Sequence, residues 1–271
     1  MGARFLNPMK SILFLLFFPG LLFSQEQKLV LKGTDHISLS RQGNVFAATE
    51  KGDVLMLDSM GNQLQHFSPR LTARIHLLEA WNGLRIFAFN RDFQNYFILD
   101  RFLLSDGPAS LNREQGYARL MAPSQDGNLW LLDEASFELQ KINLSNGQLL
   151  FSTPLNLILQ GKSYDFSFMR EYQNQLYLAD KLGPALMFDL NGSFNKKLPL
   201  QNCSWFGFDG EELLSIQKEE IVWYHPFRHT FRKKALPPAL KSASEILFLK
   251  DRVFCLQNGF LYTFQKSVLG D

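Results

Sequence analysis

The chain repeats one pattern of strands and turns, and this repeat limits its possible folds more than any other feature. Each copy has an apolar run, a polar turn, a second apolar run and then a tight turn rich in Gly and Asn. These turn residues adopt the positive φ angles that tight hairpins between antiparallel strands require. The clearest copies cover residues 45–67, 129–151 and 176–192. Weaker copies fill the gaps between them, so the repeat spans nearly the whole chain.

The second strand of each copy sets the period. Aligning these strands places six apolar residues in register: Val45, Ile86, Leu129, Leu176, Leu213 and Val253. Successive members stand 41, 43, 47, 37 and 40 residues apart. Their mean of about 42 lies within the range of about 40–50 residues typical of four-stranded propeller blades. A first strand precedes each copy, at residues 37–39, 75–77, 118–121, 166–168, 205–208 and 246–249. The sequence therefore predicts an all-β, six-bladed β-propeller of four-stranded antiparallel blades.

The last copy has only three strands, whereas residues 28–31 form a strand without a blade of its own. We expect this N-terminal strand to become the outermost strand of the sixth blade and to close the ring. Residues 25–271 would then form a single propeller domain. Two β-sandwiches are the alternative, but they would not require the repeat. The 26 Phe, 7 Tyr and 4 Trp residues suit pleated, half-buried strands.

The same residues carry a resemblance to a known class of protein. In this pattern a Gly-Asn pair precedes an aromatic or aliphatic strand, the next strand ends in Asp, and a Gly/Asn hairpin follows. This order resembles the repeat of six-bladed propellers of the NHL and TolB-like type. The resemblance covers about residues 28–266. It implies an exported bacterial protein with a role in binding. A propeller fold alone does not specify a function.

The N-terminus has the layout of a secretory signal peptide. Arg4 and Lys10 precede an apolar stretch at residues 12–18, and Ser24 is a small residue at a plausible cleavage point. The apolar stretch is too short for a membrane span and is interrupted by Pro19. We predict that residues 1–24 are removed and that the protein is periplasmic or extracellular, associated with the envelope and without a transmembrane span.

Two cysteines remain in the predicted mature chain, Cys203 and Cys255. An oxidising compartment permits a disulfide between them. Two separate buried thiols are the alternative, since free cysteine often packs as a small apolar residue.

Four polar residues adjoin the first strands, which in a propeller line the central channel. We predict them as channel-mouth residues: Asp35, His36, Asp165 and Glu245. Lactonase-type propellers resemble this architecture and hold a divalent metal with several oxygen ligands there. Hard cations need such converging ligands, but the equivalent positions of the other blades carry Arg74, Tyr117 and Ser204. We therefore predict neither a metal nor a cofactor, and we interpret Asp35 as a turn residue that bonds nearby backbone.

Motifs for catalysis are lacking. The chain contains no G-x-S-x-G elbow and no phosphate-binding glycine loop. His225 and His229 flank Pro226 in a turn-like segment, so they would not share a helix face as paired metal ligands do. Asp58, Asp100 and Asp189 recur at strand ends before turns, as residues of blade architecture do, and His76 lies among apolar neighbours as a structural histidine does.

One basic cluster is a candidate interaction surface. Its members are predicted on the outermost strands of adjacent blades: Lys196, Lys197, Arg228, Arg232, Lys233 and Lys234. Such a cluster can bind an acidic partner, although lysines on outer strands also prevent edge-to-edge aggregation, which is the interpretation we favour. The net charge of +2 does not indicate a nucleic-acid-binding domain.

Two hypotheses about function remain. The first is a non-enzymatic binding or scaffolding propeller of the bacterial cell envelope, monomeric within a complex, whose partner is a protein or a glycan. The second is a metal-dependent hydrolase or lactonase that uses the channel mouth. The low number of carboxylates at the ends of the inner strands favours the first.

Overall fold

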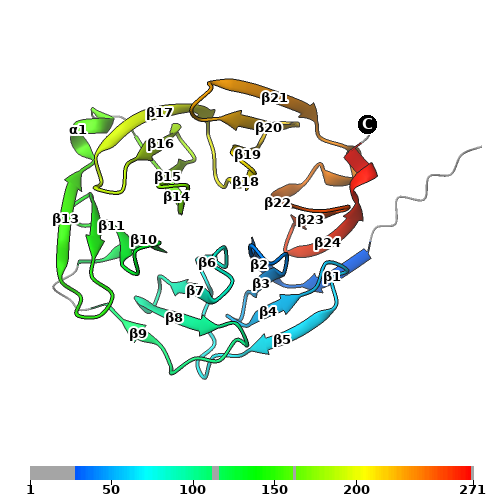
Figure 1. Ribbon diagram of the computed structural model, residues 1–271, viewed down its shortest axis with the longest axis horizontal. Helices are drawn as coiled ribbons and strands as arrows, with labels where there is room; N and C mark the ends of the chain where they lie inside the picture. The colour runs from blue at the N-terminus through cyan, green and yellow to red at the C-terminus, as the bar shows by residue number, and fades with distance from the viewer. Residues whose placement is uncertain (1–27, 112–115, 161–162, 270–271) are drawn as a thin grey trace, which may run out of the picture.

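The computed structural model describes residues 28–111, 116–160 and 163–269. Six four-stranded antiparallel sheets form a ring around a central channel (Figure 1). The predicted fold class, an all-β six-bladed propeller, is confirmed. The predicted signal peptide, residues 1–24, lies outside the described residues and stays a prediction.

The blades follow one another along the chain, each running from an inner to an outer strand. Blade 1 contains β2 (Thr34–Leu39), β3 (Val45–Thr49), β4 (Val54–Leu57) and β5 (Gln63–Phe67). Blade 2 contains β6 (Leu77–Glu79), β7 (Arg85–Asn90), β8 (Asn95–Asp100) and β9 (Ala109–Ser110). Blade 3 contains β10 (Ala118–Pro123), β11 (Leu129–Asp133), β12 (Glu138–Ile142) and β13 (Leu149–Pro154).

The second half of the ring repeats this order. Blade 4 contains β14 (Phe166–Tyr172), β15 (Gln175–Asp180), β16 (Pro184–Phe188) and β17 (Phe194–Gln201). Blade 5 contains β18 (Gly207–Asp209), β19 (Glu212–Gln217), β20 (Glu220–His225) and β21 (Thr230–Ala235). Blade 6 contains β22 (Ala243–Leu249), β23 (Arg252–Gln257) and β24 (Phe260–Gln265), and its fourth strand is β1 (Lys28–Lys32).

The N-terminal strand closes the ring, as the sequence predicts. β1 pairs antiparallel with β24, with Lys28 opposite Thr263 and Lys32 opposite Phe260 (Figure 1). The Lys28 ammonium also donates to the Met60 carbonyl in blade 1 at 3.1 Å. The first and last described strands of the chain therefore share one sheet.

Four first strands and one helical turn differ from the sequence prediction. β6 begins at Leu77 and β18 at Gly207, each two residues later than predicted. β2 begins at Thr34 and β22 at Ala243, each three residues earlier than predicted. Residues 156–159 form α1 (Asn156–Leu159), a single turn too short to show a helical period. Two 3₁₀ turns follow later, η2 (Pro238–Leu240) and η3 (Lys266–Leu269). Within the described ranges, no helix is long and apolar enough to cross a membrane.

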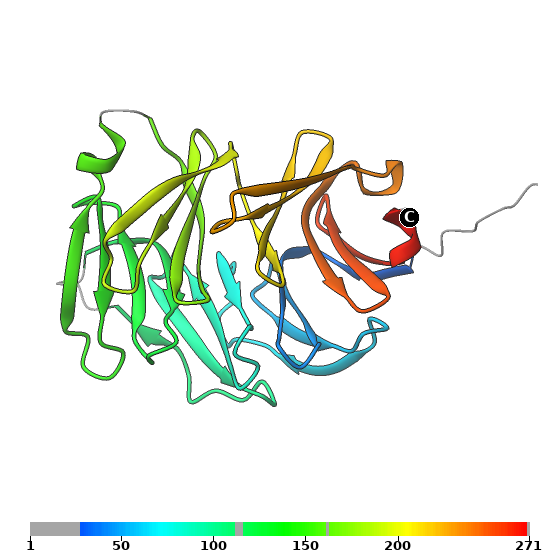
Figure 2. The same ribbon diagram turned by 45° about the horizontal axis from the view of Figure 1, so that its top comes forward.

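Aromatic residues fill the core where neighbouring sheets face each other. Seen obliquely, the sheets stand side by side around the ring, each facing its two neighbours (Figure 2). The largest fully buried side chains include Trp130, Tyr177, Phe46 and Phe206. The high Phe content is thus explained by burial between blades, which removes apolar area from water.

The recurring Asp residues stabilise the turns that follow them. The Asp58 Oδ1 accepts the backbone N–H groups of Met60 and Asn62, both at 2.8 Å. Asp100 and Asp189 accept the N–H groups two and four residues later in the same way. The prediction that these residues serve blade architecture is confirmed.

Candidate functional site

The channel opens into a polar cavity at the end where the first strands begin. This cavity, which we call the charged mouth, has a volume of about 330 Å³. The structure brings all four predicted channel-mouth residues to its wall: Asp35, His36, Asp165 and Glu245. Arg74, Arg91, Arg119 and Lys181 join them there, so four cationic side chains face three carboxylates.

Asp35 lies in blade 1 and binds Arg74 of blade 2. The Arg74 Nε donates to the Asp35 Oδ2 at 2.9 Å, and its second nitrogen donates to Oδ1 at 2.8 Å. Such two-pronged pairing is among the strongest geometries between arginine and carboxylate. Asp35 therefore bonds a neighbouring blade, and the interpretation that it bonds nearby backbone was wrong.

Asp165 lies in blade 4 and is held by Arg119 of blade 3. One Arg119 nitrogen contacts the Asp165 carboxylate, while its Nε donates to the Phe166 carbonyl at 2.8 Å. The Lys181 ammonium stands 3.9 Å from the other Asp165 oxygen. This carboxylate is thus flanked by two cations.

Glu245 holds the seam where blade 6 meets blade 1. Its Oε1 is 2.7 Å from the His36 Nδ1, and its Oε2 accepts the Ile37 N–H at 2.8 Å. Burial alone would lower the pKa of His36, but the charge and hydrogen bond of Glu245, together with Asp35, raise it overall. The proton on His36 is therefore stabilised by the folded state.

These three carboxylates share one arrangement, because each bonds a side chain or backbone group of an adjacent blade. Their oxygens accept hydrogen bonds from groups of the protein and do not converge on a common point where a metal ion could bind. Among the described residues, no group of three or more His, Cys, Asp or Glu side chains could hold a metal ion. The donor set does not suit the metal-dependent hydrolase hypothesis, since divalent cations need several free oxygens.

Arg91 is the cation of the charged mouth that takes part in none of these ion pairs. Its backbone N–H donates to the His76 Nδ1 at 3.2 Å. Burial, and then the charge of Arg91, lower the pKa of His76, so this histidine stays a neutral acceptor, and its predicted structural role is confirmed. Within the described ranges, the Arg91 guanidinium has neither a hydrogen bond nor an ion pair.

Sequence reasoning missed three of the cations at the mouth: Arg91, Arg119 and Lys181. Arg91 and Lys181 follow the second strands of blades 2 and 4, and Arg119 is the second residue of β10. The repeat contained a usable signal, because turns after second strands reach the same end of the ring as the starts of first strands.

The basic cluster lies on the outer edge, with one correction. Lys196 and Lys197 are on β17, and Arg232, Lys233 and Lys234 are on β21, as predicted. Arg228 instead precedes β21, in the turn where the chain reverses direction.

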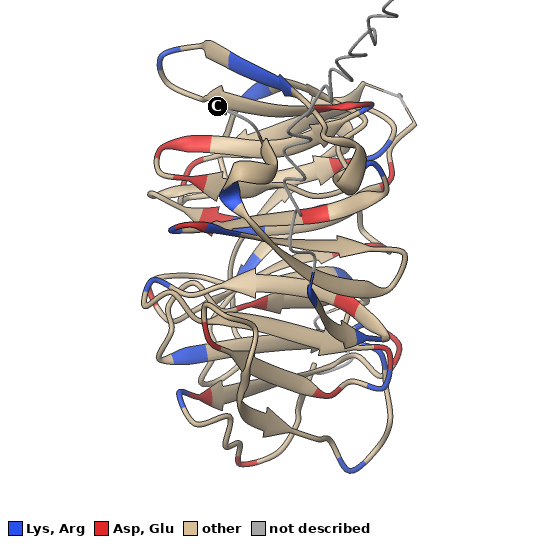
Figure 3. Cartoon of the chain, turned by 90° about the vertical axis from the view of Figure 1, so that its right-hand side faces the viewer, with Lys and Arg blue, Asp and Glu red and all other residues tan. Residues whose placement is uncertain are grey.

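Acidic partners offset much of this cluster. Arg232 pairs with Glu212 at 2.8 Å, Lys233 with Glu220 at 3.2 Å and Arg228 with Glu211 at 3.4 Å. The Lys196 ammonium contacts the Pro226 carbonyl. On the adjoining side of the ring, acidic and basic segments are likewise interspersed (Figure 3). This mixture favours protection of the strand edge, and an interaction role stays a prediction.

The histidines near this cluster stabilise the turn itself. The His225 Nδ1 accepts the backbone N–H groups of Phe227 and Arg228 at 3.3 and 3.2 Å. The His229 Nδ1 bonds the Tyr224 hydroxyl at 3.0 Å. The predicted turn is confirmed.

Both cysteines are free and buried. The Cys203 thiol donates to the Trp205 carbonyl at 3.1 Å. Burial raises the pKa of Cys203 to about 11 and that of Cys255 to about 12. Of the two alternatives left open by the sequence, the structure has separate buried thiols.

The comparisons with known proteins concern the fold. No protein-family model matches the chain, and no curated protein sequence matches it. A streptogramin B lyase structure is similar with a TM-score of 0.61 and 14% identity, covering 88% of this chain and 86% of the lyase. A virginiamycin B lyase from Staphylococcus aureus, solved as an inactive variant with quinupristin, has a TM-score of 0.62 and 12% identity over 89% and 99% of the two chains.

A third similar structure is the extracellular domain of a B. thetaiotaomicron protein described as a one-component system. Its TM-score is 0.56 and its identity 12%, and the match covers 86% of this chain but 33% of that one. Such low identities show the propeller fold alone, and these neighbours differ in function among themselves. The site must therefore be interpreted from its own residues.

Proposed function

We propose that the protein is a non-enzymatic binding propeller of the bacterial cell envelope, of the NHL and TolB-like type. Its charged mouth would receive an acidic group of a protein or glycan partner. One observation carries this proposal: the carboxylates of the charged mouth are hydrogen-bonded to the protein, whereas the Arg91 guanidinium beside them has no partner among the described residues. Export rests on the predicted signal peptide at residues 1–24.

The balance of charge at the mouth supports an acidic ligand. Four cations and three carboxylates line the mouth, and Glu134 just outside it pairs with Arg119 at 3.0 Å. The uncommitted positive charge is therefore that of Arg91, and the raised pKa of His36 adds positive charge as the pH falls. A concave surface with excess charge of one sign concentrates its field on a ligand of opposite sign. Arginine presents a planar fork of donors, which suits carboxylates and sulfates.

The committed carboxylates argue for binding rather than catalysis. A general base must be free to accept a proton from the reacting group. Asp35 and Asp165 instead accept hydrogen bonds from Arg74 and Arg119, and Glu245 accepts them from blade 1. Their role is to hold blades together and to fix the shape of the mouth.

The test is affinity purification of the tagged mature protein from its native envelope fraction, with mild cross-linking and mass spectrometry. Wild type, Arg91→Gln and a matched control, Arg85→Gln, are compared. Arg85 also has an uncommitted guanidinium, but it lies at the other end of the channel.

We expect a stoichiometric partner that wild type and Arg85→Gln retain and Arg91→Gln loses. Because surface charges are screened by salt, raising the ionic strength should release the partner from wild type. A partner that Arg91→Gln retains in full would refute the charged mouth as the binding site. Failure to recover any partner with the cross-linked wild type would refute the scaffold proposal.

A further inference from the structure

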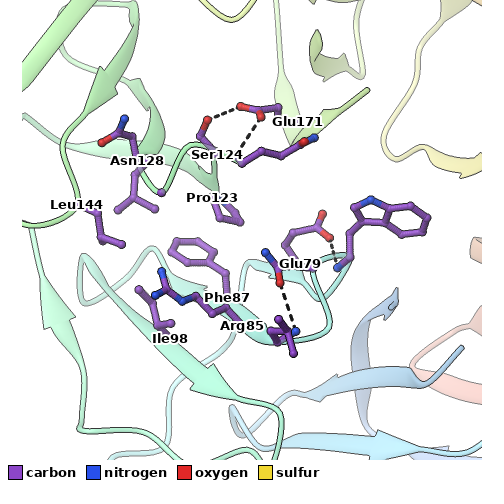
Figure 4. A pocket seen from close by; sticks show the side chains of 15 residues that line it. Glu79, Arg85, Phe87, Ile98, Pro123, Ser124, Asn128, Leu144 and Glu171 are labelled. Atoms are coloured by element: carbon purple, nitrogen blue, oxygen red, sulfur yellow. Dashed lines mark hydrogen bonds between the residues drawn. The ribbon is translucent and has the colours of Figure 1, made fainter. Parts of the chain in front are cut away.

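A second cavity opens at the end of the ring opposite the charged mouth, between blades 2 and 3. Its volume is about 220 Å³. Glu79 ends β6, Pro123 ends β10 and Arg85 begins β7. First strands that begin at the charged mouth end here, so the two cavities lie at opposite ends of the channel. We call this cavity the inter-blade pocket (Figure 4).

The walls of the inter-blade pocket are mainly apolar. Trp81, Phe87, Ile98, Leu129 and Leu144 line it. Pockets of about 300–1,000 Å³ hold drug-sized ligands, so this smaller one has room for a single bulky group such as a phenyl ring. The walls therefore select an apolar body of limited size.

Both carboxylates that line the pocket are already satisfied. The Glu171 Oε2 accepts hydrogen bonds from the Ser124 hydroxyl at 2.5 Å and the Trp130 indole N–H at 2.6 Å, and its Oε1 accepts the Gln125 N–H at 2.9 Å. Glu79 is also engaged, as the next contacts show. Both glutamates thus have their acceptor oxygens occupied by donors of the protein.

Glu79 belongs to a buried ion pair. Its Oε2 contacts the Arg170 guanidinium, and its Oε1 accepts the Trp81 N–H at 2.8 Å. Another Arg170 nitrogen donates to the Ser38 hydroxyl at 3.3 Å. Arg170 therefore neutralises Glu79 within the channel wall.

Arg85 is the charged residue of the pocket that lacks a partner in the described part of the chain. Its side chain is exposed and extends beside Phe87 and Ile98, with Leu144 and Asn128 nearby (Figure 4). A guanidinium next to apolar walls offers paired donors to the carboxylate of a ligand whose apolar part contacts those walls. Charge complementarity thus defines the polar end of the ligand.

We propose that the inter-blade pocket binds a carboxylic acid that carries one aromatic or branched aliphatic group. The apolar group fills the space between Trp81 and Leu144, and the carboxylate pairs with Arg85. Free small acids and peptides that end in a bulky apolar residue both have this chemistry.

Isothermal titration calorimetry with four probes tests this ligand class. 3-Phenylpropionate supplies ring and charge, 3-phenylpropionamide lacks the charge, and acetate lacks the ring. For so small a ligand we expect a dissociation constant on the order of 1 mM for 3-phenylpropionate. The amide and acetate should each bind at least about tenfold more weakly, which corresponds to loss of one good polar or apolar contact.

The fourth probe, N-acetyl-alanyl-phenylalanine, distinguishes the two sources. Tighter binding than 3-phenylpropionate identifies a peptide C-terminus, and weaker binding identifies a free acid. Either result requires first that 3-phenylpropionate binds better than its amide.

The variant Arg85→Gln should weaken 3-phenylpropionate at least about tenfold, whereas Arg101→Gln, at an exposed arginine outside both cavities, should leave its affinity unchanged. Arg85 is exposed, so its replacement should not affect folding, and circular dichroism checks this. Equal affinity for acid and amide would overturn the proposal. Undiminished binding to Arg85→Gln, or no binding to wild type, would do the same.

Discussion

Glu171 is the residue whose removal we expect to destabilise the propeller most clearly. It lies on β14 in blade 4, whereas its three donors, Ser124, Gln125 and Trp130, belong to blade 3. One buried carboxylate therefore joins two blades through three hydrogen bonds. The variant Glu171→Ala would remove the acceptor and leave the donors in place.

The magnitude follows from what the donors lose. The Trp130 side chain is fully buried, so its indole N–H would have no partner, whereas Gln125 is exposed and water can replace the acceptor of its N–H. Each unsatisfied buried donor costs about 1–3 kcal/mol. The Ser124 hydroxyl can rotate to another acceptor and adds little. Glu171→Ala should thus lower the free energy of unfolding by about 2 kcal/mol, roughly 4–8 °C in Tm for a chain of this size.

Urea denaturation and calorimetry at neutral pH measure this change. Glu134→Ala is the matched control, because Glu134 also accepts a hydrogen bond, from Arg119 at 3.0 Å, but is 49% exposed. Exposed pairs contribute about 0–1 kcal/mol, so the control should stay close to wild type. A loss of stability in Glu171→Ala no larger than in Glu134→Ala would refute the reasoning.

The remaining predictions concern titration and thiol chemistry. Since the folded state raises the pKa of His36, the pair with Glu245 stabilises the protein fully below the ordinary histidine pKa, and this contribution is lost as pH rises through the folded value. The Tm difference between wild type and Glu245→Gln should therefore shrink as the pH rises above the ordinary histidine pKa, and a difference independent of pH would contradict the pairing. Cys203 and Cys255 are free, buried and high in pKa, so a thiol reagent should label neither in the native protein and both after unfolding. A non-reducing peptide map that links them would contradict this.

The fold was accessible from sequence because its signals are local and repeated. Gly and Asn at the hairpins, together with apolar runs, identify strands without knowledge of their partners, and the period then orders the blades. The unpaired strand at residues 28–31 indicated ring closure for the same reason. The late starts of β6 and β18 were not accessible, since the residues that begin a ladder depend on the neighbouring strand.

Only some residues of the charged mouth could be predicted from the sequence. The period places Asp35, Asp165 and Glu245 at equivalent ends of inner strands, so their shared cavity could be predicted. Their partners could not be predicted with the same ease, because a pair between blades depends on the reach and direction of both side chains. Asp35 and Arg74 nevertheless occupy equivalent places in adjacent blades, which could have suggested their contact. Nothing in the local sequence indicates that Arg85 faces an apolar pocket.

The separation of the two cavities allows the two proposals to be judged independently. β10 reaches from Arg119 near the charged mouth to Pro123 at the inter-blade pocket. At about 3.3 Å per residue the cavities are more than 10 Å apart, a distance at which substitutions usually act additively. The double variant with Arg85→Gln and Arg91→Gln should therefore lose the partner to the same extent as Arg91→Gln alone. Its affinity for 3-phenylpropionate should fall to the same extent as in Arg85→Gln alone. If occupying the pocket with 3-phenylpropionate changed partner retention by wild type, the cavities would be coupled through the first strands, and the assumption that each end of the channel acts alone would be wrong.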